Sequence, residues 1–170
     1  MNEYLGKTCR DIVSGFEGIC TGVLEWMYGC RQYTLQAKVN ETENRKERLS
    51  SFFEKQLEVI DEGVTGKVEI PPDEPPKFFG KECRDKVTGI RGMCIGRMVW
   101  LFNSTQYIIE IPAKDPDKTS RLEWLDEGRV ELSENPEREL DPEEVKSPRP
   151  GGVFDGAEWV TAPSAPDFGR

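Results

Sequence analysis

An internal repeat is the feature that most constrains how this chain folds. Residues 6–35 align without a gap on residues 80–109, at an offset of 74, and thirteen of the thirty positions are identical. A shorter match relates LEVIDEG at 57–63 to LEWLDEG at 122–128, at an offset of 65. Copy one would then carry nine extra residues between its two blocks. Repeats of this kind indicate one structural unit that is present twice.

Each copy is predicted to consist of short β-strands. A Lys-x-Cys-Arg-Asp segment forms the first strand, and a Ser-Gly or Thr-Gly dipeptide after it signals a tight turn. The expected second and third strands are 19–28 and 33–39 in copy one, and 93–102 and 107–111 in copy two. Gly22 and Gly96 mark a bulge or a bend in the second strand. The LEVIDEG and LEWLDEG blocks supply a fourth strand, and the turn at Asp-Glu-Gly leads into a last short one.

We therefore expect a mostly β chain with two tandem small SH3-like β-barrels, partly open. A sandwich of two meanders is the alternative. In copy one, the residues Leu49, Phe52, Phe53 and Leu57 have helical spacing, which predicts a short inserted helix over 43–57. An ordinary loop with a few buried side chains is the alternative there.

The composition along the chain predicts four parts. They are a first β-barrel module at 1–70, a Pro-rich linker at 71–78, a second β-barrel module at 79–134 and an extended Pro-rich tail at 135–170. The linker motif IPPDEPP is typical of a stiff spacer. The tail is too polar to order by burying its own side chains. We expect it to be anchored on neighbouring molecules by Val153, Phe154, Trp159 and Phe168.

The five cysteines suggest one cross-strand disulfide in each module. A two-residue turn at the Ser-Gly or Thr-Gly dipeptide places Cys9 directly opposite Cys20, and Cys83 opposite Cys94. The alternative is four reduced thiols that pack as small apolar side chains. Cys30 has no counterpart in copy two, so it is expected to be free or to bridge to another chain.

The charge and the missing histidine disfavour several classes of protein. The net charge of −9 repels nucleic acid and anionic membranes, and no Lys/Arg cluster opposes it. The absence of histidine removes the commonest general base and metal ligand. We therefore expect no enzyme, no metal site and no cofactor. The sequence also shows no export signal and no apolar run long enough to span a membrane.

Two kinds of polar residue are repeated without forming a catalytic motif. The Asp-Glu pairs at 61–62 and 126–127 each precede a glycine, which favours turns over a hydrolytic carboxylate pair. Asp11 and Asp85, each beside an arginine, are expected to form surface ion pairs.

Repeated basic and aromatic side chains are the candidate binding residues. Aromatic side chains on an SH3-like barrel can line a ligand groove or stack on bases, although a repeated tryptophan also serves to fill a core. The candidates are Lys7, Arg10, Trp26, Gln32, Tyr33, Lys81, Arg84, Trp100, Gln106 and Tyr107, together with Phe154, Trp159 and Phe168 in the tail.

The motif G-K-x-C/V-x-D-x-V-T/S-G-F/I-x-G, followed by G-C-x-Q-Y and x-W-x-D-E, resembles a group of small single-module proteins of tailed phages and prophages. Copy one matches at Gly6, Lys7, Asp11, Val13, Gly15, Phe16, Gly18, Gly29, Cys30, Gln32, Tyr33, Asp61 and Glu62. Copy two matches at Gly80, Lys81, Asp85, Val87, Thr88, Gly89, Gly92, Gln106, Tyr107, Trp124, Asp126 and Glu127. The resemblance covers both modules but neither the linker nor the tail. It implies a phage origin and a compact β-barrel, without a defined activity, and the group usually has valine at the positions of the paired cysteines.

The leading functional prediction is a non-enzymatic phage structural or accessory protein. It would be made in the host cytoplasm and incorporated in the virion, where it binds capsid or tail subunits or copies of itself. One alternative is a counter-defence protein that sequesters a host signalling nucleotide, with Lys7, Arg10, Lys81 and Arg84 on the phosphates. Another alternative is an SH3-like nucleic-acid-binding module.

Overall fold

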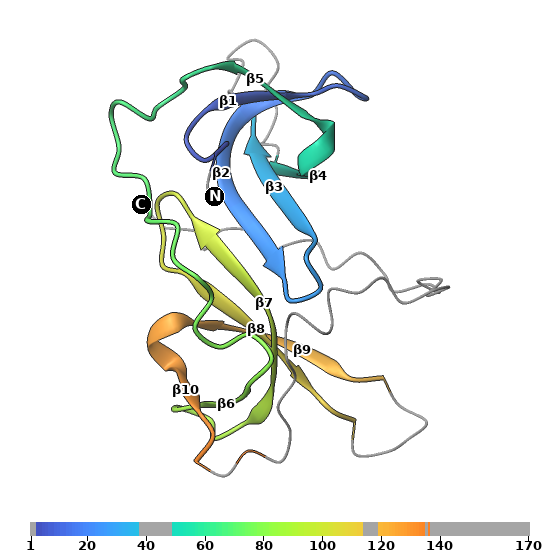
Figure 1. Cartoon of the computed structure of the whole chain (residues 1–170), viewed down its shortest axis with the longest axis vertical. Coiled ribbons are helices and arrows are strands. Elements are labelled where there is room, and N and C mark those ends of the chain that lie inside the picture. Colours follow the sequence, from blue (N-terminus) through green and yellow to red (C-terminus); the bar gives the residue numbers. More distant parts are fainter. Residues whose placement is uncertain (1–2, 38–48, 114–118, 135, 137–170) are drawn as a thin grey trace, which may run out of the picture.

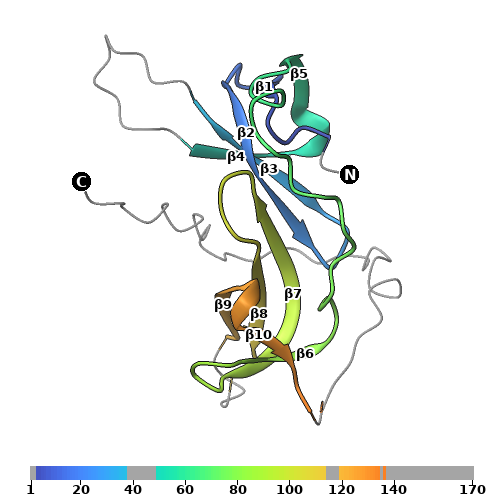
Figure 2. The same ribbon diagram turned by 90° about the vertical axis from the view of Figure 1, so that its left-hand side faces the viewer.

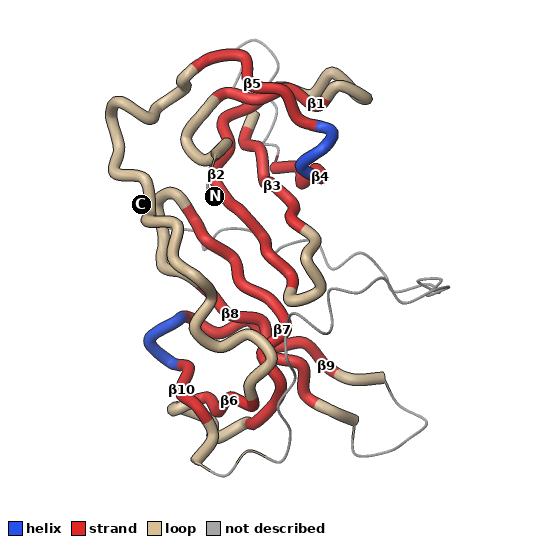
Figure 3. Tube along the Cα trace, viewed as in Figure 1, coloured by secondary structure: helices blue, strands red, loops and turns tan. Residues whose placement is uncertain are grey.

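The strands of this chain join into a single sheet that runs through both halves of the molecule (Figures 1 and 3). The structure is a computed structural model that describes residues 3–37, 49–113, 119–134 and 136. Over these residues the sheet has ten strands, and its main path runs β10-β6-β7-β2-β1-β5. Strands β3 and β4 branch from β2, and β8 and β9 branch from β7.

The two halves contain the same succession of elements. The first half has β1 (Thr8–Asp11), β2 (Glu17–Trp26), β3 (Arg31–Gln36), β4 (Leu49–Phe53), the 3-10 turn η1 (Glu54–Gln56) and β5 (Leu57–Asp61). The second half has β6 (Glu82–Asp85), β7 (Arg91–Trp100), β8 (Gln106–Ile111), β9 (Arg121–Asp126), the 3-10 turn η2 (Glu127–Arg129) and β10 (Val130–Leu132). In each half the first strand pairs with the second and the fifth, and the third strand lies between the second and the fourth.

The pairing corrects the alignment of the LEVIDEG and LEWLDEG blocks. Leu57 lies opposite Asp11, and its counterpart opposite Asp85 is Val130, so the offset at the fifth strand is 73 and not 65. LEVIDEG therefore lies in β5 against β1, whereas LEWLDEG lies in β9 against β8. The two blocks share a local pattern of apolar residues before a turn, but they occupy different strands. Copy one does not carry nine extra residues.

The helix expected over 43–57 is also wrong within the described residues, because 49–53 is strand β4. Burial alternates along β4, as it does on a strand with one covered face. Two side-chain contacts stabilise this strand. The ring centroids of Phe52 and Phe16 are 5.4 Å apart, and the hydroxyl oxygens of Thr34 and Ser51 are 3.1 Å apart. Pairing with β3 therefore overrides the helical spacing of the apolar residues. Within 49–57 the only helical residues are those of the turn η1, and 43–48 lies outside the described residues.

The predicted mostly β fold is confirmed, and over the described residues the sheet stays open, because it does not close into a complete barrel. Among the described residues, no pairing joins β4 to β5 or β9 to β10. Instead β2 and β7, each ten residues long, extend beyond their own half and pair with each other in antiparallel fashion. We call this β2–β7 pairing the seam. It makes one continuous sheet of the two halves (Figure 2).

The bulges expected at the strand glycines are confirmed, and they help to build the seam. The β2–β3 register shifts between Cys20 and Gly22, and the β7–β8 register shifts between Cys94 and Gly96. Each bulge leaves one residue outside the pairing with its own half. The carbonyl oxygens of these two residues, Thr21 and Ile95, accept hydrogen bonds of 2.8 Å from backbone N–H groups of the opposite half.

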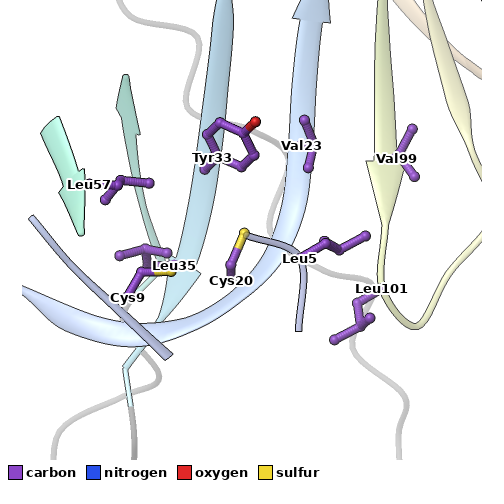
Figure 4. Packing of buried hydrophobic residues seen from close by; sticks show 9 residues of the cluster. All are labelled: Leu5, Cys9, Cys20, Val23, Tyr33, Leu35, Leu57, Val99 and Leu101. Atoms are coloured by element: carbon purple, nitrogen blue, oxygen red, sulfur yellow. The ribbon is translucent and has the colours of Figure 1, made fainter. Parts of the chain in front are cut away.

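The apolar core also crosses from one half into the other. Its largest cluster lies under β1, β2 and β3 of the first half, yet Val99 and Leu101 of the second half belong to it (Figure 4). A second cluster lies wholly within the second half, around Cys83, Cys94 and Tyr107. A third cluster packs Met27 of the first half against apolar residues of β7 and β8. Burial of these side chains therefore holds the two halves together as one structure.

The predicted disulfides are not formed, and all five cysteines are free thiols. The β1–β2 loop has four residues and not two, because the Asp11 N–H bonds to the Phe16 carbonyl. This moves the register by two residues, so Cys9 lies opposite Gly18 and only diagonal to Cys20. The loop in the second half is built in the same way. Four thiols are buried and pack as small apolar side chains, whereas Cys30 is exposed.

Candidate functional site

The β1–β2 hairpin tip is a loop with internal hydrogen bonds that exposes apolar side chains. Asp11 is 2% exposed, and its Oδ2 accepts hydrogen bonds from the Ser14 N–H at 2.8 Å and from the Ser14 hydroxyl at 2.5 Å. Gly15 completes the loop with a φ of +72°, a value that glycine adopts without strain. Ile12 and Val13 are left 60% and 75% exposed. The fold thus fixes two apolar side chains in water at this tip.

The β6–β7 hairpin tip repeats the same construction at the other end of the molecule (Figures 1 and 2). Asp85 accepts from the Thr88 N–H at 3.2 Å and from the Thr88 hydroxyl at 2.6 Å, and Gly89 has a φ of +73°. Val87 is 73% exposed. The side chain next to it is Lys86, whose Nζ donates to the Gly128 carbonyl at 2.9 Å. We call the two loops, 12–15 and 86–89, the hairpin tips.

The two aspartates differ in how their charge is balanced. The Arg129 guanidinium donates from Nε to Asp85 Oδ1 at 3.1 Å and from Nη2 to Asp85 Oδ2 at 2.6 Å. This ion pair holds the pKa of Asp85 well below its ordinary value, with further help from the Thr88 hydroxyl. The pKa of Asp11 is lowered chiefly by the Ser14 hydroxyl, and its Oδ1 has no hydrogen-bond partner. Asp85 therefore does form an ion pair, with Arg129. Both aspartates are buried turn-forming residues, so the expectation that they lie on the surface is wrong.

The flanks of the hairpin tips carry opposite charge. In the first half, Arg10 forms ion pairs with Glu17 at 2.6 Å and with Glu58 at 3.1 Å, so acidic groups outnumber it. At the equivalent place in the second half, Arg84 lies opposite a second arginine, Arg91. The first hairpin tip is thus flanked by a net negative cluster and the second by a net positive one. The two hairpin tips therefore offer a partner the same loop conformation but surroundings of opposite charge.

Several predicted binding residues lie in the core. Tyr33 is fully buried and Tyr107 is 1% exposed. The ring of Tyr33 packs edge-on to Tyr4 at 4.8 Å, and that of Tyr107 packs edge-on to Phe78 at 4.8 Å. Burial raises the pKa of both phenols. These side chains therefore support the fold rather than forming an exposed aromatic surface.

The tryptophan and glutamine candidates lie on or beside the seam. Trp100 covers Gly22, and Trp26 covers Gly96, on opposing strands. The Trp100 Nε1 donates to Gln106 Oε1 at 3.3 Å, while Gln32 lies opposite Phe53 on β4. The structure thus places both tryptophans where they join the halves. The tail candidates Phe154, Trp159 and Phe168 lie outside the described residues.

Among the described residues, the basic candidates do not line the cleft beside the linker. The backbone carbonyls of Lys7 and Lys81 accept hydrogen bonds from Cys20 and Cys94, and both lysine side chains are partly exposed. The structure has a cleft of about 170 Å³ beside the linker, lined by Pro71, Pro72, Glu74, Pro75, Lys77, Arg97, Val99, Thr105, Tyr107 and Glu127. Ligand pockets usually measure about 300–1,000 Å³. The cleft is therefore small for a nucleotide, and it contains none of the four basic candidates.

A buried ion pair on the seam was not expected from the sequence. Glu25 and Arg97 lie directly opposite each other, with both side chains 7% exposed, and Arg97 Nε donates to Glu25 Oε2 at 3.0 Å. Arg31 also reaches Glu25, at 2.9 Å. Arg97 donates a further hydrogen bond of 2.7 Å to the Glu74 carbonyl of the linker. The only signal in the sequence is that each charge interrupts a largely apolar strand.

The described part of the chain holds no group of three or more His, Cys, Asp or Glu residues placed to bind a metal ion. None of its helices has the length and apolar character needed to cross a membrane. No protein-family model, curated protein or solved structure matches this chain.

Proposed function

We propose that this chain is a non-enzymatic binding protein that bridges larger assemblies through its two hairpin tips. The observation that carries the proposal is that Val13 and Val87, at opposite ends of one continuous sheet, are each about three-quarters exposed on a loop with internal hydrogen bonds. Apolar side chains held in water in this way are suited to insertion into a pocket on a partner. One chain would thus grip two sites at a fixed separation.

The construction of the hairpin tips supports this role. In each tip a buried aspartate binds both the backbone and the hydroxyl of Ser14 or Thr88, so the loop is ordered before any partner arrives. A preorganised loop loses little conformational entropy on binding. The oppositely charged flanks would direct the two tips to different sites.

We further propose that the two halves descend from one duplicated module, and that the assembly is the virion of a tailed phage. The repeated registers support the duplication. The phage assignment rests on the motif that resembles small phage proteins, and on an acidic, Pro-rich segment after the second module that is suited to run along neighbouring subunits. Capsid or tail subunits, or further copies of this chain, would be the partners.

The test is to locate the protein in purified particles and to map its contacts. Val13→Cys and Val87→Cys chains, each in a Cys30→Ser background, would carry a thiol-linked photo-crosslinker. Mass spectrometry should find the chain in the particle, with crosslinks from both hairpin tips to other virion proteins. Glu69→Cys is the matched control, because Glu69 is exposed but lies outside the tips. The proposal fails if particles lack the chain, or if the tips crosslink no more than position 69.

A further inference from the structure

The seam contains one set of contacts that any two copies of the module could make. Leu24 and Met98 are equivalent residues, and they face each other at the centre of the β2–β7 pairing. On either side a tryptophan of one half lies opposite a glycine of the other, and these pairs are Trp100 with Gly22 and Trp26 with Gly96. A Cβ at Gly22 would lie 2.9 Å from the Trp100 ring, and one at Gly96 would lie 3.1 Å from the Trp26 ring. Each half thus contributes an equivalent glycine and an equivalent tryptophan to the seam.

A second set of contacts differs between the halves. Val23 lies opposite Val99, and Glu25 lies opposite Arg97. At the offset of 74, the residue equivalent to Arg97 is Val23, and the residue equivalent to Val99 is Glu25. Two first halves in this register would therefore place each Glu25 against a valine. Two second halves would place each Arg97 against a valine. In a pair of first halves each Glu25 would keep only the Arg31 of its own half, and in a pair of second halves each Arg97 would face no carboxylate across the seam. Both arrangements lose the buried ion pair across the seam, which is unfavourable.

From this arrangement we infer that the seam is a recognition interface selective for the opposite half, and that its partner can be a second copy of this chain. In this dimer the first half of each chain pairs with the second half of the other chain. We call it the exchanged dimer. The Trp–Gly and Leu–Met contacts favour pairing in general. The Glu25–Arg97 pair determines which halves meet. The exchanged dimer would carry four hairpin tips.

The connection between the halves is long enough for this exchange. Strand β5 ends at Asp61 and β6 begins at Glu82, so twenty residues lie between them. An extended chain of that length spans up to about 66–72 Å. The proline-rich stretch 71–76 has no regular secondary structure and would remain extended if it crossed to a second chain. Exchange of an identical part between two copies is a low-cost route to dimers.

Two charge-reversed full-length chains provide the test. In Glu25→Arg two arginines meet across the seam, and in Arg97→Glu two glutamates meet. Neither variant can therefore form an ion pair between positions 25 and 97 of the same chain. When the two variants are expressed together, both seams can contain an ion pair only in the exchanged dimer, because position 25 of each chain then meets an opposite charge at position 97 of the other chain. We expect a one-to-one dimer of twice the 19.4 kDa chain mass by light scattering and native mass spectrometry. Each variant alone should give no such dimer.

Two controls separate selectivity from non-specific association. The double variant Glu25→Arg with Arg97→Glu restores opposite charges across the seam of one chain, so it should be monomeric. It should melt above either single variant but below the wild type, because it loses the contacts to Arg31 and to the Glu74 carbonyl. The exposed pair Arg10–Glu17 lies within one half, so co-expressing its two charge-reversed variants should give no dimer. This experiment needs only the purified chain, so its outcome does not depend on whether the chain bridges larger assemblies as proposed above.

A measurement on the wild-type chain covers the case in which the reversed seam does not fold. Isotopically light and heavy wild-type chains, unfolded together and refolded at high concentration, should give dimers of mixed mass. The inference is overturned if the co-expressed variants stay monomeric or aggregate while the double variant folds. It is equally overturned if one variant alone dimerises as readily as the mixture, or if wild-type refolding gives no mixed dimers.

Discussion

The Glu25–Arg97 pair should couple the two halves more strongly than any other polar contact of the seam, and a double-mutant cycle measures that coupling. Both side chains are 7% exposed, so replacing either with methionine leaves the other charge buried. Breaking a buried pair in this way costs about 3–5 kcal/mol. Domains of this kind are stable by only about 5–15 kcal/mol, so each single variant should lose a large part of its stability.

The double variant should be much less destabilised than the sum of the single variants. Two methionines leave no buried charge, and such apolar replacements are often close to neutral. The remaining losses are the hydrogen bond to Glu74 and the ion pair with Arg31, each worth about 1 kcal/mol. We therefore expect a coupling energy of at least about 3 kcal/mol between positions 25 and 97.

Urea unfolding followed by tryptophan fluorescence is the appropriate assay, because Trp26 and Trp100 both cover glycines of the seam. The free energy of unfolding would be measured for the wild type, both single variants and the double variant under the same conditions. If the cost of the double variant equals the sum of the two single costs, the charges do not act as a pair and the reasoning is refuted.

Three further predictions concern the hairpin tip, the thiols and the bulge. Arg129→Gln should raise the pKa of Asp85 toward its ordinary value. A carboxyl whose pKa is lowered in the folded state stabilises the fold above about pH 4, and this contribution is lost on acidification. The variant should therefore unfold at a higher pH than the wild type, and an unchanged acid midpoint by circular dichroism would count against the ion pair. Only Cys30 should react quickly with a thiol reagent in the native chain, and the four buried thiols should react after urea is added; fast reaction of several thiols would contradict the burial of the others. Gly22→Ala would place a Cβ 2.5 Å from a side-chain atom of β7 and should cost about 1–3 kcal/mol by thermal melting, whereas Gly66→Ala, with nothing within 4 Å, should cost far less.

Local sequence was sufficient to predict the first three strands of each half and the bulges at Gly22 and Gly96. These features depend on near neighbours: apolar residues at strand spacing, and a glycine that interrupts a strand. The tight turn was placed correctly, but its loop length was not. A buried aspartate that binds the loop backbone favours four residues over two, and Ser-Gly alone does not reveal this.

The LEWLDEG block correctly predicted the fourth strand of the second half, β9. The fourth strand of the first half and the seam could not be predicted, because they depend on contacts distant in sequence. Strand β4 takes its conformation from β3, and its apolar residues fit a helix equally well in isolation. The seam joins residues more than seventy positions apart, around Leu24 and Met98. One signal was present in the sequence: residues 93–100, MCIGRMVW, are apolar on both faces apart from Gly96 and Arg97, which is typical of a central strand. The structure buries β7 on both faces over most of its length. The hairpin tips were missed because exposed valines carry no signal until their exposure is known.

The bulges have a consequence for how the molecule unfolds. Each bulge directs a carbonyl, that of Thr21 or Ile95, to an N–H of the other half, so neither half keeps all its backbone hydrogen bonds when the other melts. Heating should therefore disrupt the whole sheet in one cooperative event, with equal calorimetric and van't Hoff enthalpies, although the sequence reads as two separate modules.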